Sequence, residues 1–188
     1  MSLCQCVVMH LLLHKPLHPY HRCGAKFLLQ AMLVTLVNHI HLVAKKQKSR
    51  LQIMREILKK DVVDYVYCLY GMDYLEVEDA IYQLTSIAED YQADVVFSTY
   101  KVLEVEKGLF YQYRTDNQIH VVKASDYEVY QKKHFSNLNS LQGTLIKTPI
   151  IESVLNETVA TEDEVMLKVI SRSSRIYYKD SYFWIKKS

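Results

Sequence analysis

Residues 62–100, VVDYVYCLYGMDYLEVEDAIYQLTSIAEDYQADVVFSTY, contain the pattern that decides the fold. Residues 62–69 are β-branched and aromatic with little polarity, which is typical of a strand covered on both faces. Residues 77–91 then place apolar side chains at three- and four-residue steps, which predicts an amphipathic helix. Residues 93–100 repeat the buried-strand pattern. The stretch therefore predicts a strand–helix–strand unit in an α/β protein.

The segments on either side extend this pattern. Residues 50–60 have one apolar helical face. Three short strand-like runs within residues 101–122, separated by turn residues, predict a meander of antiparallel strands. Ser125 and Thr161 each precede a Glu by three positions, which is the spacing of a capping box at the start of a helix. Two strand-like runs occur within residues 175–187. We expect a mixed sheet flanked by helices.

The first part of the chain has a different character. Residues 1–44 hold six of the eight His, three of the four Cys and no acidic residue. We therefore divide the chain into a His/Cys-rich head, residues 1–49, and an α/β domain, residues 50–188. In the head, residues 27–43 form an apolar run that polar side chains interrupt, so a buried or interfacial helix is favoured over a membrane span.

The cysteines and the net charge of the chain indicate its cellular compartment and the partners to consider. Three of the four cysteines lie within the first 23 residues, so they cannot form a disulfide framework across the chain, and a reducing, cytoplasmic compartment is the simpler interpretation. A formal net charge of +2 gives no indication of a nucleic-acid partner. Zinc binding by the head remains an alternative, with candidate ligands Cys4, Cys6, His10, His14, His18, His21 and Cys23.

Residues 64–188 resemble a known protein family. The sequence of residues 64–100 is followed by GTLIKTPIIES at residues 143–153, ATEDEVMLKVI at residues 160–170 and RIYYKDSYFWIKKS at residues 175–188. In kind, order and spacing, these segments are similar to the C-terminal half of bacterial family 2 glycosyltransferases. The resemblance implies a truncated GT-A-like α/β fold with a helical N-terminal head.

The resemblance also implies a chemistry. In the family, an acidic cluster after the strand that corresponds to residues 64–69 holds Mn²⁺ or Mg²⁺, which neutralises the diphosphate of a nucleotide sugar. Here the corresponding residues are Tyr70-Gly71-Met72-Asp73. Asp73 is therefore the one acidic residue left to bind the nucleotide sugar and the metal ion. The family's Glu-Asp motif corresponds to Glu162 and Asp163, with Asp163 as the base that deprotonates the acceptor. The residues alone allow another interpretation, in which both are first-turn acids that stabilise a helix N-terminus.

Three functional hypotheses follow. The chain is a glycosyltransferase-like protein that moves a sugar from a nucleotide sugar to a glycan or cell-envelope acceptor, impaired because the acidic cluster and the donor-binding strands are missing. Alternatively, it is a non-catalytic relative that binds a sugar or a complete transferase, or a zinc-binding head on a scaffold. We expect it in the cytoplasm, with the inner membrane surface as a further location. We also expect the head to cover the open sheet edge, or the protein to form a homodimer.

Overall fold

The computed structural model describes residues 6–11, 40–43, 49–60, 63–70, 73–112, 114–134 and 141–187. In these residues, nine strands form one sheet in the order β2-β1-β3-β8-β5-β9-β4, with β6 paired to β5 and β7 paired to β9. The strands are β1 (Cys6–Leu11), β2 (Ile40–Val43), β3 (Tyr65–Tyr70), β4 (Tyr74–Leu75), β5 (Val95–Glu104), β6 (Leu109–Tyr111), β7 (Ile119–Val122), β8 (Thr144–Lys147) and β9 (Ile176–Lys187). The helices are α2 (Arg50–Leu58), α3 (Ala80–Asp90), the 3-10 turn η1 (Ala124–Asp126), α4 (Tyr127–His134), α5 (Thr148–Leu155) and α6 (Glu162–Arg172).

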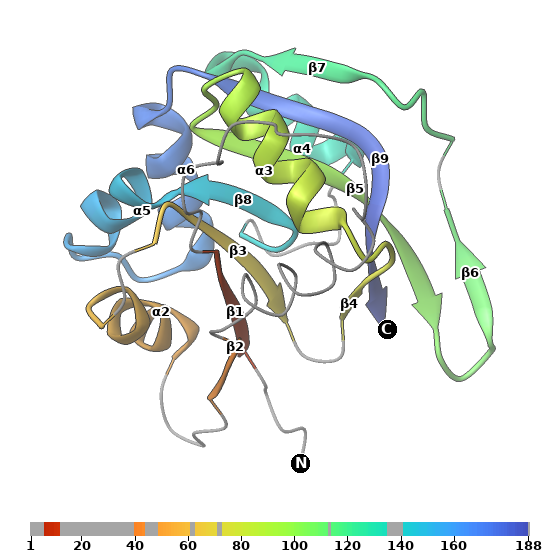
Figure 1. Ribbon diagram of the computed structural model, residues 1–188, viewed down its shortest axis with the longest axis horizontal. Helices are drawn as coiled ribbons and strands as arrows, with labels where there is room; N and C mark the ends of the chain where they lie inside the picture. The colour runs from red at the N-terminus through yellow and green to blue at the C-terminus, as the bar shows by residue number, and fades with distance from the viewer. Residues whose placement is uncertain are drawn as a thin grey trace, which may run out of the picture.

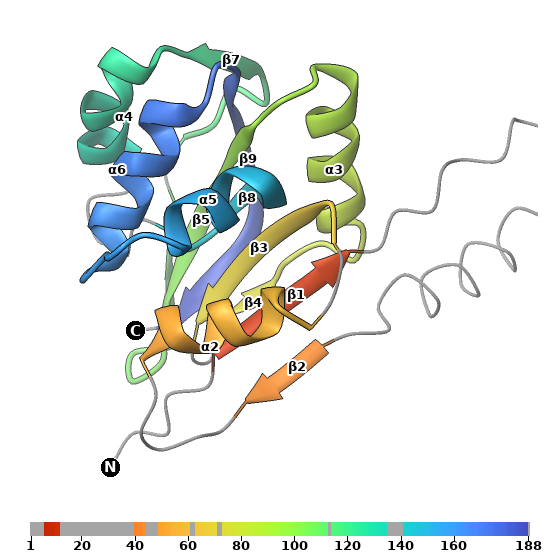
Figure 2. The same ribbon diagram turned by 90° about the vertical axis from the view of Figure 1, so that its left-hand side faces the viewer.

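The helices lie on both faces of the sheet (Figure 1). Helix α3 covers one face, and α2, α4, α5 and α6 cover the other (Figure 2). Most neighbouring strands are antiparallel, while β5 and β9 are parallel. The predicted mixed α/β sheet flanked by helices is therefore confirmed.

The predicted strand–helix–strand unit consists of β3, α3 and β5. These two strands point in the same direction but are not neighbours, because β8 lies between them and is antiparallel to both. Ile146 in β8 faces Val66 on one side and Val95 on the other. All three side chains are buried, so the centre of the sheet is also the centre of the core. Local periodicity identified both outer strands but could not show that a later strand would insert between them.

The amphipathic patterns of the helices correspond to buried faces. In α2, the predicted apolar face is buried, as Leu51, Met54, Ile57 and Leu58 show. Ser49 with Gln52 forms a capping box at its N-terminus. Helix α3 begins at Ala80, later than residue 77, and buries its apolar stripe against the sheet. Helix α6 begins as predicted, because the Thr161 side chain accepts a hydrogen bond from the backbone N–H of Glu164. By contrast, Ser125 lies within η1 and caps no helix there.

The described parts of the head belong to the sheet. β1 pairs antiparallel with β3 along its full length, from Cys6 opposite Tyr70 to Leu11 opposite Tyr65, and β2 pairs with β1. The expectation that the head covers the β3 edge therefore holds. The predicted helix over residues 27–43 is wrong at Ile40–Val43, which form β2, and its remaining residues lie outside the described part. None of the helices that the structure describes is long and apolar enough to cross a membrane.

Two strand predictions need correction. The expected three-strand meander does not form, because β6 pairs with β5 whereas β7 pairs with β9. β5 also continues through the run that we expected to be a separate strand, and it ends at Glu104. The two closing runs form the single long strand β9, whose pairing with β5 shifts register near Thr99. Hydrogen bonds between distant segments decide these arrangements, and a local pattern does not contain them.

Candidate functional site

The candidate site lies at the edge of the sheet where β3 ends. Asp73 follows β3, and Gln142 precedes β8 and forms a bridge to Cys68 of β3. Gln142 Nε2 donates a hydrogen bond to the Asp73 carboxylate. The backbone N–H of Gly143 donates to the Cys68 carbonyl at 2.8 Å. The segment before β8 is therefore fixed against the end of β3, and it presents an amide group to the acidic residue.

Two stacked aromatic side chains pack against the segment that precedes β8. Gly143 has a φ of +69°, and a Cβ atom at this position would lie 2.3 Å from Nε1 of Trp184. The Trp184 indole is fully buried and stacks on Tyr100, with ring centroids 4.9 Å apart. Glycine is required here for two reasons: the backbone is left-handed and the indole occupies the place of a side chain. The close contact fixes the position of the Gln142–Gly143 segment.

Burial also determines the chemistry of Tyr67, which lies in β3 beneath the site. The side chain is fully buried, and burial raises the pKa of its phenol far above the usual value. The charge of Asp73 contributes to this increase in the pKa as a smaller cause. Tyr67 is therefore a neutral residue that packs in the core beside β8.

Neighbouring charges are already paired. Lys101 near the end of β5 forms an ion pair with Glu76, and its Nζ atom lies 5.0 Å from the ring centroid of Tyr182. Glu76 follows β4, so this pair holds β4 and β5 together at the same side of the sheet. The Lys101 ammonium group is therefore already engaged in a contact between β5 and the residue that follows β4.

The acidic residues at the start of α6 have different roles. Glu162 Oε1 lies 3.4 Å from Arg50 Nη1, which connects the N-termini of α6 and α2. Glu164 accepts a hydrogen bond from the backbone N–H of Ala160, and this bond lowers the pKa of its carboxyl group. Asp163 is the exposed member of the three. Its nearness to the buried phenol of Tyr127 contributes, after burial itself, to the raised pKa of that group.

The position of α6 relates Asp163 to Asp73. The C-terminal end of α6 is fixed to the start of β5, because Asp94 Oδ2 accepts hydrogen bonds from the backbone N–H groups of Ser174 at 2.8 Å and Arg175 at 3.1 Å. From there α6 runs back along the sheet, opposite in direction to β9 (Figure 2). Its N-terminus with Asp163 therefore points toward the end of the sheet at which β3 finishes.

Three side chains that could bind a metal ion lie together near the loop before β7. In the described ranges, one such group exists, formed by Asp116, His120 and Asp180, whose ligand atoms lie within 4.8 Å of one another. Neither Asp73 nor the acids of α6 belong to it. Asp180 Oδ1 accepts hydrogen bonds from Thr99 and Tyr178 at 2.9 Å each, and its Oδ2 accepts from the backbone N–H of Asp116 at 2.9 Å. These hydrogen bonds show that the three side chains connect β9 to the loop before β7, which accounts for their nearness.

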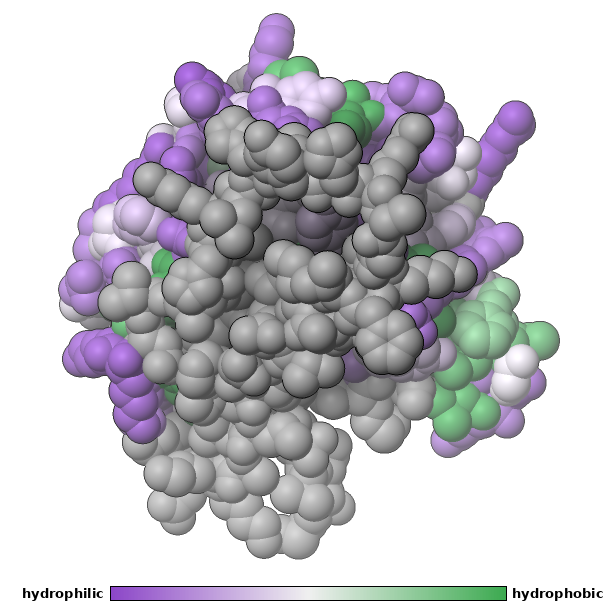
Figure 3. Space-filling view, viewed as in Figure 1, coloured by the Kyte–Doolittle hydropathy of each residue, from purple (hydrophilic) through white to green (hydrophobic). Residues whose placement is uncertain are grey.

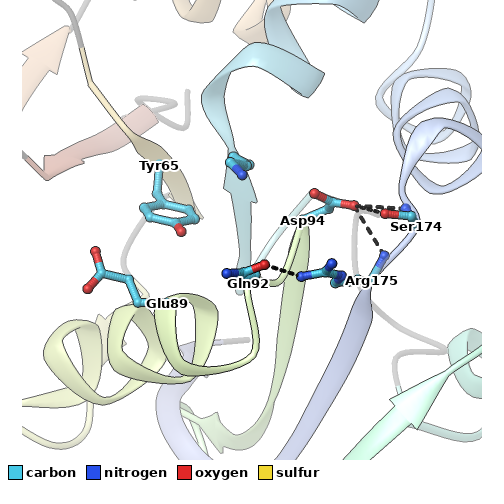
Figure 4. Close-up of a pocket in the computed structure, with 7 residues that line it drawn as sticks. Tyr65, Glu89, Gln92, Asp94, Ser174 and Arg175 are labelled. Carbon is cyan, nitrogen blue, oxygen red and sulfur yellow. Dashed lines mark hydrogen bonds between the residues drawn. The ribbon is translucent and has the colours of Figure 1, made fainter.

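A polar pocket of about 480 Å³ lies at the opposite end of the sheet (Figure 4). It is lined by Tyr65, Glu89, Gln92, Asp94, Lys147, Ser174 and Arg175. Two of its polar groups bond to each other, because the Arg175 guanidinium donates to Gln92 Oε1 at 2.5 Å. Asp94 is used to hold the turn between α6 and β9. The pocket thus lies where β3, β5 and β9 begin, and its polar side chains mainly hold the starts of β5 and β9 together.

Sequence reasoning predicted Asp73, Glu162 and Asp163 as site residues, and it did not indicate the residues that surround Asp73. Gln142 and Trp184 were missed because each acts across a long sequence separation, 69 positions in the case of Gln142 and Asp73. Gly143 belongs to the segment of residues 143–153 that resembles the family, but the resemblance gave it no role. A glycine directly before a buried strand is a signal of close backbone approach, and it could have indicated this contact.

Comparisons with known proteins place the fold. No family model matches the chain, and no curated protein sequence matches it. Among solved structures, S. aureus TarS residues 1–349 matches with a TM-score of 0.60 and 12% identity, covering 87% of this chain and 48% of that one. TarS is a family 2 glycosyltransferase. The fold is glycosyltransferase-like.

Two further TarS structures give the same result. The complex with UDP-GlcNAc matches with a TM-score of 0.61 and 12% identity over 88% of this chain and 46% of that one. The complex with UDP matches with a TM-score of 0.56 and 12% identity over 88% and 48%. This chain therefore spans about half the length of these structures. At this identity the likeness concerns the fold, and it confirms the family resemblance at that level.

Proposed function

We propose that this chain binds a nucleotide sugar at the edge of the sheet where β3 ends, and that it transfers the sugar to a glycan or cell-envelope acceptor poorly. The glycosyltransferase-like fold supports the first part, as does the presence of UDP-GlcNAc or UDP in two of the matched TarS structures. One observation supports the second part. Asp73 is the single carboxylate among residues 70–73, and it is hydrogen-bonded by an amide instead of standing beside a second carboxylate.

The residues at this edge do not fit a divalent cation well. Mg²⁺ and Mn²⁺ are held by one or two carboxylates together with substrate phosphates, and they prefer oxygen ligands. Tyr70 and Met72 replace acidic residues of the family pattern, and Gln142 directs a donor N–H₂ at Asp73. We therefore expect any binding of a nucleotide sugar to be independent of such cations, and no catalytic step is assigned to one.

Asp163 is the residue that we propose as base. It is exposed at the N-terminus of α6, whereas Glu162 is engaged with Arg50. An exposed carboxylate can reach an acceptor hydroxyl and accept its proton. Its direction toward the β3 end of the sheet is the geometric support for this role.

A non-catalytic binding protein is the second candidate. The same observation at Asp73 favours it, because a site without a means of neutralising the leaving diphosphate would retain ligand binding and lose turnover. The ligand would be a sugar, or the partner a complete transferase. The zinc alternative depends on head residues whose side chains lie outside the described part of the structure.

Calorimetric titration with UDP-GlcNAc and UDP, with and without Mn²⁺, tests the proposal. We expect binding that is the same in both conditions, weakened by Asp73→Asn and unchanged in the control Asp90→Asn, an exposed acid at the end of α3. Mn²⁺-dependent binding would contradict our interpretation of Asp73. Absence of binding to a folded protein would contradict the proposal as a whole.

Release of sugar from the donor, followed by chromatography, separates the two candidates. A slow transferase should show release that Asp163→Asn abolishes and Asp90→Asn does not change. A non-catalytic relative should show binding without release in all variants.

A further inference from the structure

The side chains of Asp116, His120 and Asp180 converge at the place where the loop before β7 meets β9. Their ligand atoms lie within 4.8 Å of one another, and His120 Nε2 lies 3.0 Å from Asp116 Oδ2. In a tetrahedral zinc site, bonds of about 2.0–2.2 Å to nitrogen and oxygen place the ligand atoms roughly 3.3–3.6 Å apart. Side-chain movements of about 1–1.5 Å therefore bring all three atoms into contact with one ion.

Backbone pairing holds the three side chains in this arrangement. The pairing of β9 with β5 shifts register at Asp180, which has no partner residue in β5, and a bulge of this kind redirects a side chain. The backbone N–H of Asn117 donates to the Asp180 carbonyl at 3.0 Å, and the backbone N–H of Asp180 donates to the Gln118 carbonyl at 2.9 Å. His120 lies opposite Tyr178 in the β7–β9 pair, and the two rings stack. The fold therefore positions the ligand atoms, and little remains to be ordered when an ion binds.

Asp180 is a buried carboxylate without a positive partner. The residue is 9% exposed, and it forms no ion pair with any of the residues that the structure describes. Its three hydrogen-bond donors are all uncharged, namely the hydroxyls of Thr99 and Tyr178 and the backbone N–H of Asp116. Buried charges in proteins are normally paired with an opposite charge or coordinate a metal ion. The burial of Asp180 thus indicates a cation independently of the convergence of the three side chains.

Asp116 adds a second negative charge at the same point. The backbone N–H of Gln118 donates to Asp116 Oδ1 at 2.8 Å, and this bond is the largest cause that lowers the pKa of the Asp116 carboxyl group. The hydrogen bond with His120 lowers this pKa further. Asp116 is therefore ionised at neutral pH. A divalent ion between the two carboxylates balances their charge, and the imidazole of His120 supplies it with a nitrogen ligand.

We propose that Asp116, His120 and Asp180 bind one zinc-type divalent ion, with water at its fourth position. One imidazole nitrogen and two carboxylate oxygens suit Zn²⁺, whereas Mg²⁺ and Ca²⁺ prefer oxygen ligands alone. Thr99 and Tyr178 are the outer partners that orient the Asp180 carboxylate, as hydrogen-bonded neighbours of metal ligands commonly do.

The ion reaches this site from solvent. The side chains of His120 and Asp116 are 36% and 51% exposed, and hydrophilic side chains predominate over β7, at the top of the molecule in Figure 3. Three protein ligands and an open fourth position describe a zinc site that exchanges its water, unlike a closed structural site with four protein ligands. The inference does not depend on the proposed sugar chemistry, and its ligands are separate from the zinc-ligand candidates in the head.

Equilibrium dialysis of the full chain against Zn²⁺, followed by elemental analysis, tests the proposal. His120→Phe keeps a ring beside Tyr178 and removes the nitrogen ligand, and Asp116→Asn removes one carboxylate. We expect each variant to bind one zinc ion per chain fewer than the unsubstituted protein, or to bind it at least about tenfold more weakly. Asp90→Asn, at an exposed acid of α3, is the control and should bind zinc as the unsubstituted protein does. Any zinc bound by the head stays in every variant, so the difference reports this site.

Thermal unfolding followed by circular dichroism gives a second readout. Zn²⁺ stabilises the folded state that binds it, so it should raise the Tm of the unsubstituted protein and of Asp90→Asn more than that of His120→Phe. The spectra without zinc should show the same fold in each variant. If zinc binding and the increase in Tm are the same in His120→Phe as in the unsubstituted protein, the proposal is refuted. Equal binding of Mg²⁺ and Zn²⁺ at this site would also refute it, because the nitrogen ligand would then play no part.

Discussion

Gly143→Ala examines the contact that positions the candidate site. A methyl group at residue 143 would lie 2.3 Å from Nε1 of the Trp184 indole, and the backbone there has a φ of +69°. Gly108 provides a matched control. It has a φ of +63°, and nothing lies within 4 Å of the place that a Cβ atom would take. The two substitutions therefore share the backbone cost and differ in the clash.

The magnitudes follow from these two components. Placing alanine in left-handed backbone costs about 1–2 kcal/mol. The lower entropy of the unfolded alanine variant offsets about 0.4–1 kcal/mol of this. Forcing a methyl group into a packed core costs about 1–3 kcal/mol more. We expect Gly108→Ala to lower the free energy of unfolding by about 0–1.5 kcal/mol and Gly143→Ala by about 1–4.5 kcal/mol.

Urea denaturation followed by tryptophan fluorescence measures both values. Trp184 is the single tryptophan of the chain, so the signal comes from the residue that would be displaced. We also expect the emission of folded Gly143→Ala to differ from that of the unsubstituted protein. If both variants lose the same stability, the indole does not occupy the space beside Gly143, and our account of the site is refuted.

Three further predictions concern the rest of the molecule. Asp94→Ala removes the acceptor for Ser174 and Arg175 and should cost about 1–3 kcal/mol in urea, whereas Asp94→Asn should cost less; equal losses would contradict the clamp. Thr161→Ala should cost about 1 kcal/mol by loss of the α6 cap, and a change to serine should be nearly neutral. Burial raises the pKa of Tyr178, so its contribution to stability is complete below the unfolded value of 10.0 and is lost as pH rises above it. Between about pH 10 and 11, the fall in stability should be shallower in Tyr178→Phe by up to ~1.4 kcal/mol per pH unit, and an unchanged slope would exclude this titration.

Sequence reasoning succeeded where a local pattern is enough. The helical period of α3 and the apolar runs of β3 and β5 predicted their types and approximate bounds, since burial on one or both faces dictates which residues can occupy them. The start of α6 was predicted from one side chain, because the cap at Thr161 acts within the same turn.

The remaining arrangement depends on pairing between distant segments. Nothing local to residues 144–147 indicates that they insert between β3 and β5, because any buried strand has the same composition. Similarly, Asp116 and Asp180 are separated by 64 positions, and their contact follows from the pairing of β7 with β9. For the candidate site, the sequence indicated the acidic residues. It did not indicate the Gln142 amide that bonds to Asp73, or the Trp184 indole that packs against Gly143.

The long strand β9 has a consequence for how the protein is made. It pairs with β5, β7 and β4, so the ribosome completes these partners before it makes the strand that joins them. Roughly 80 residues separate the starts of β5 and β9, and at ~5–20 residues per second this interval lasts about 4–16 seconds. During this time one edge of a strongly apolar strand stays without its partner in the nascent chain. Until translation has passed β9, this edge is open to pairing with other strands, which makes the growing polypeptide prone to aggregation.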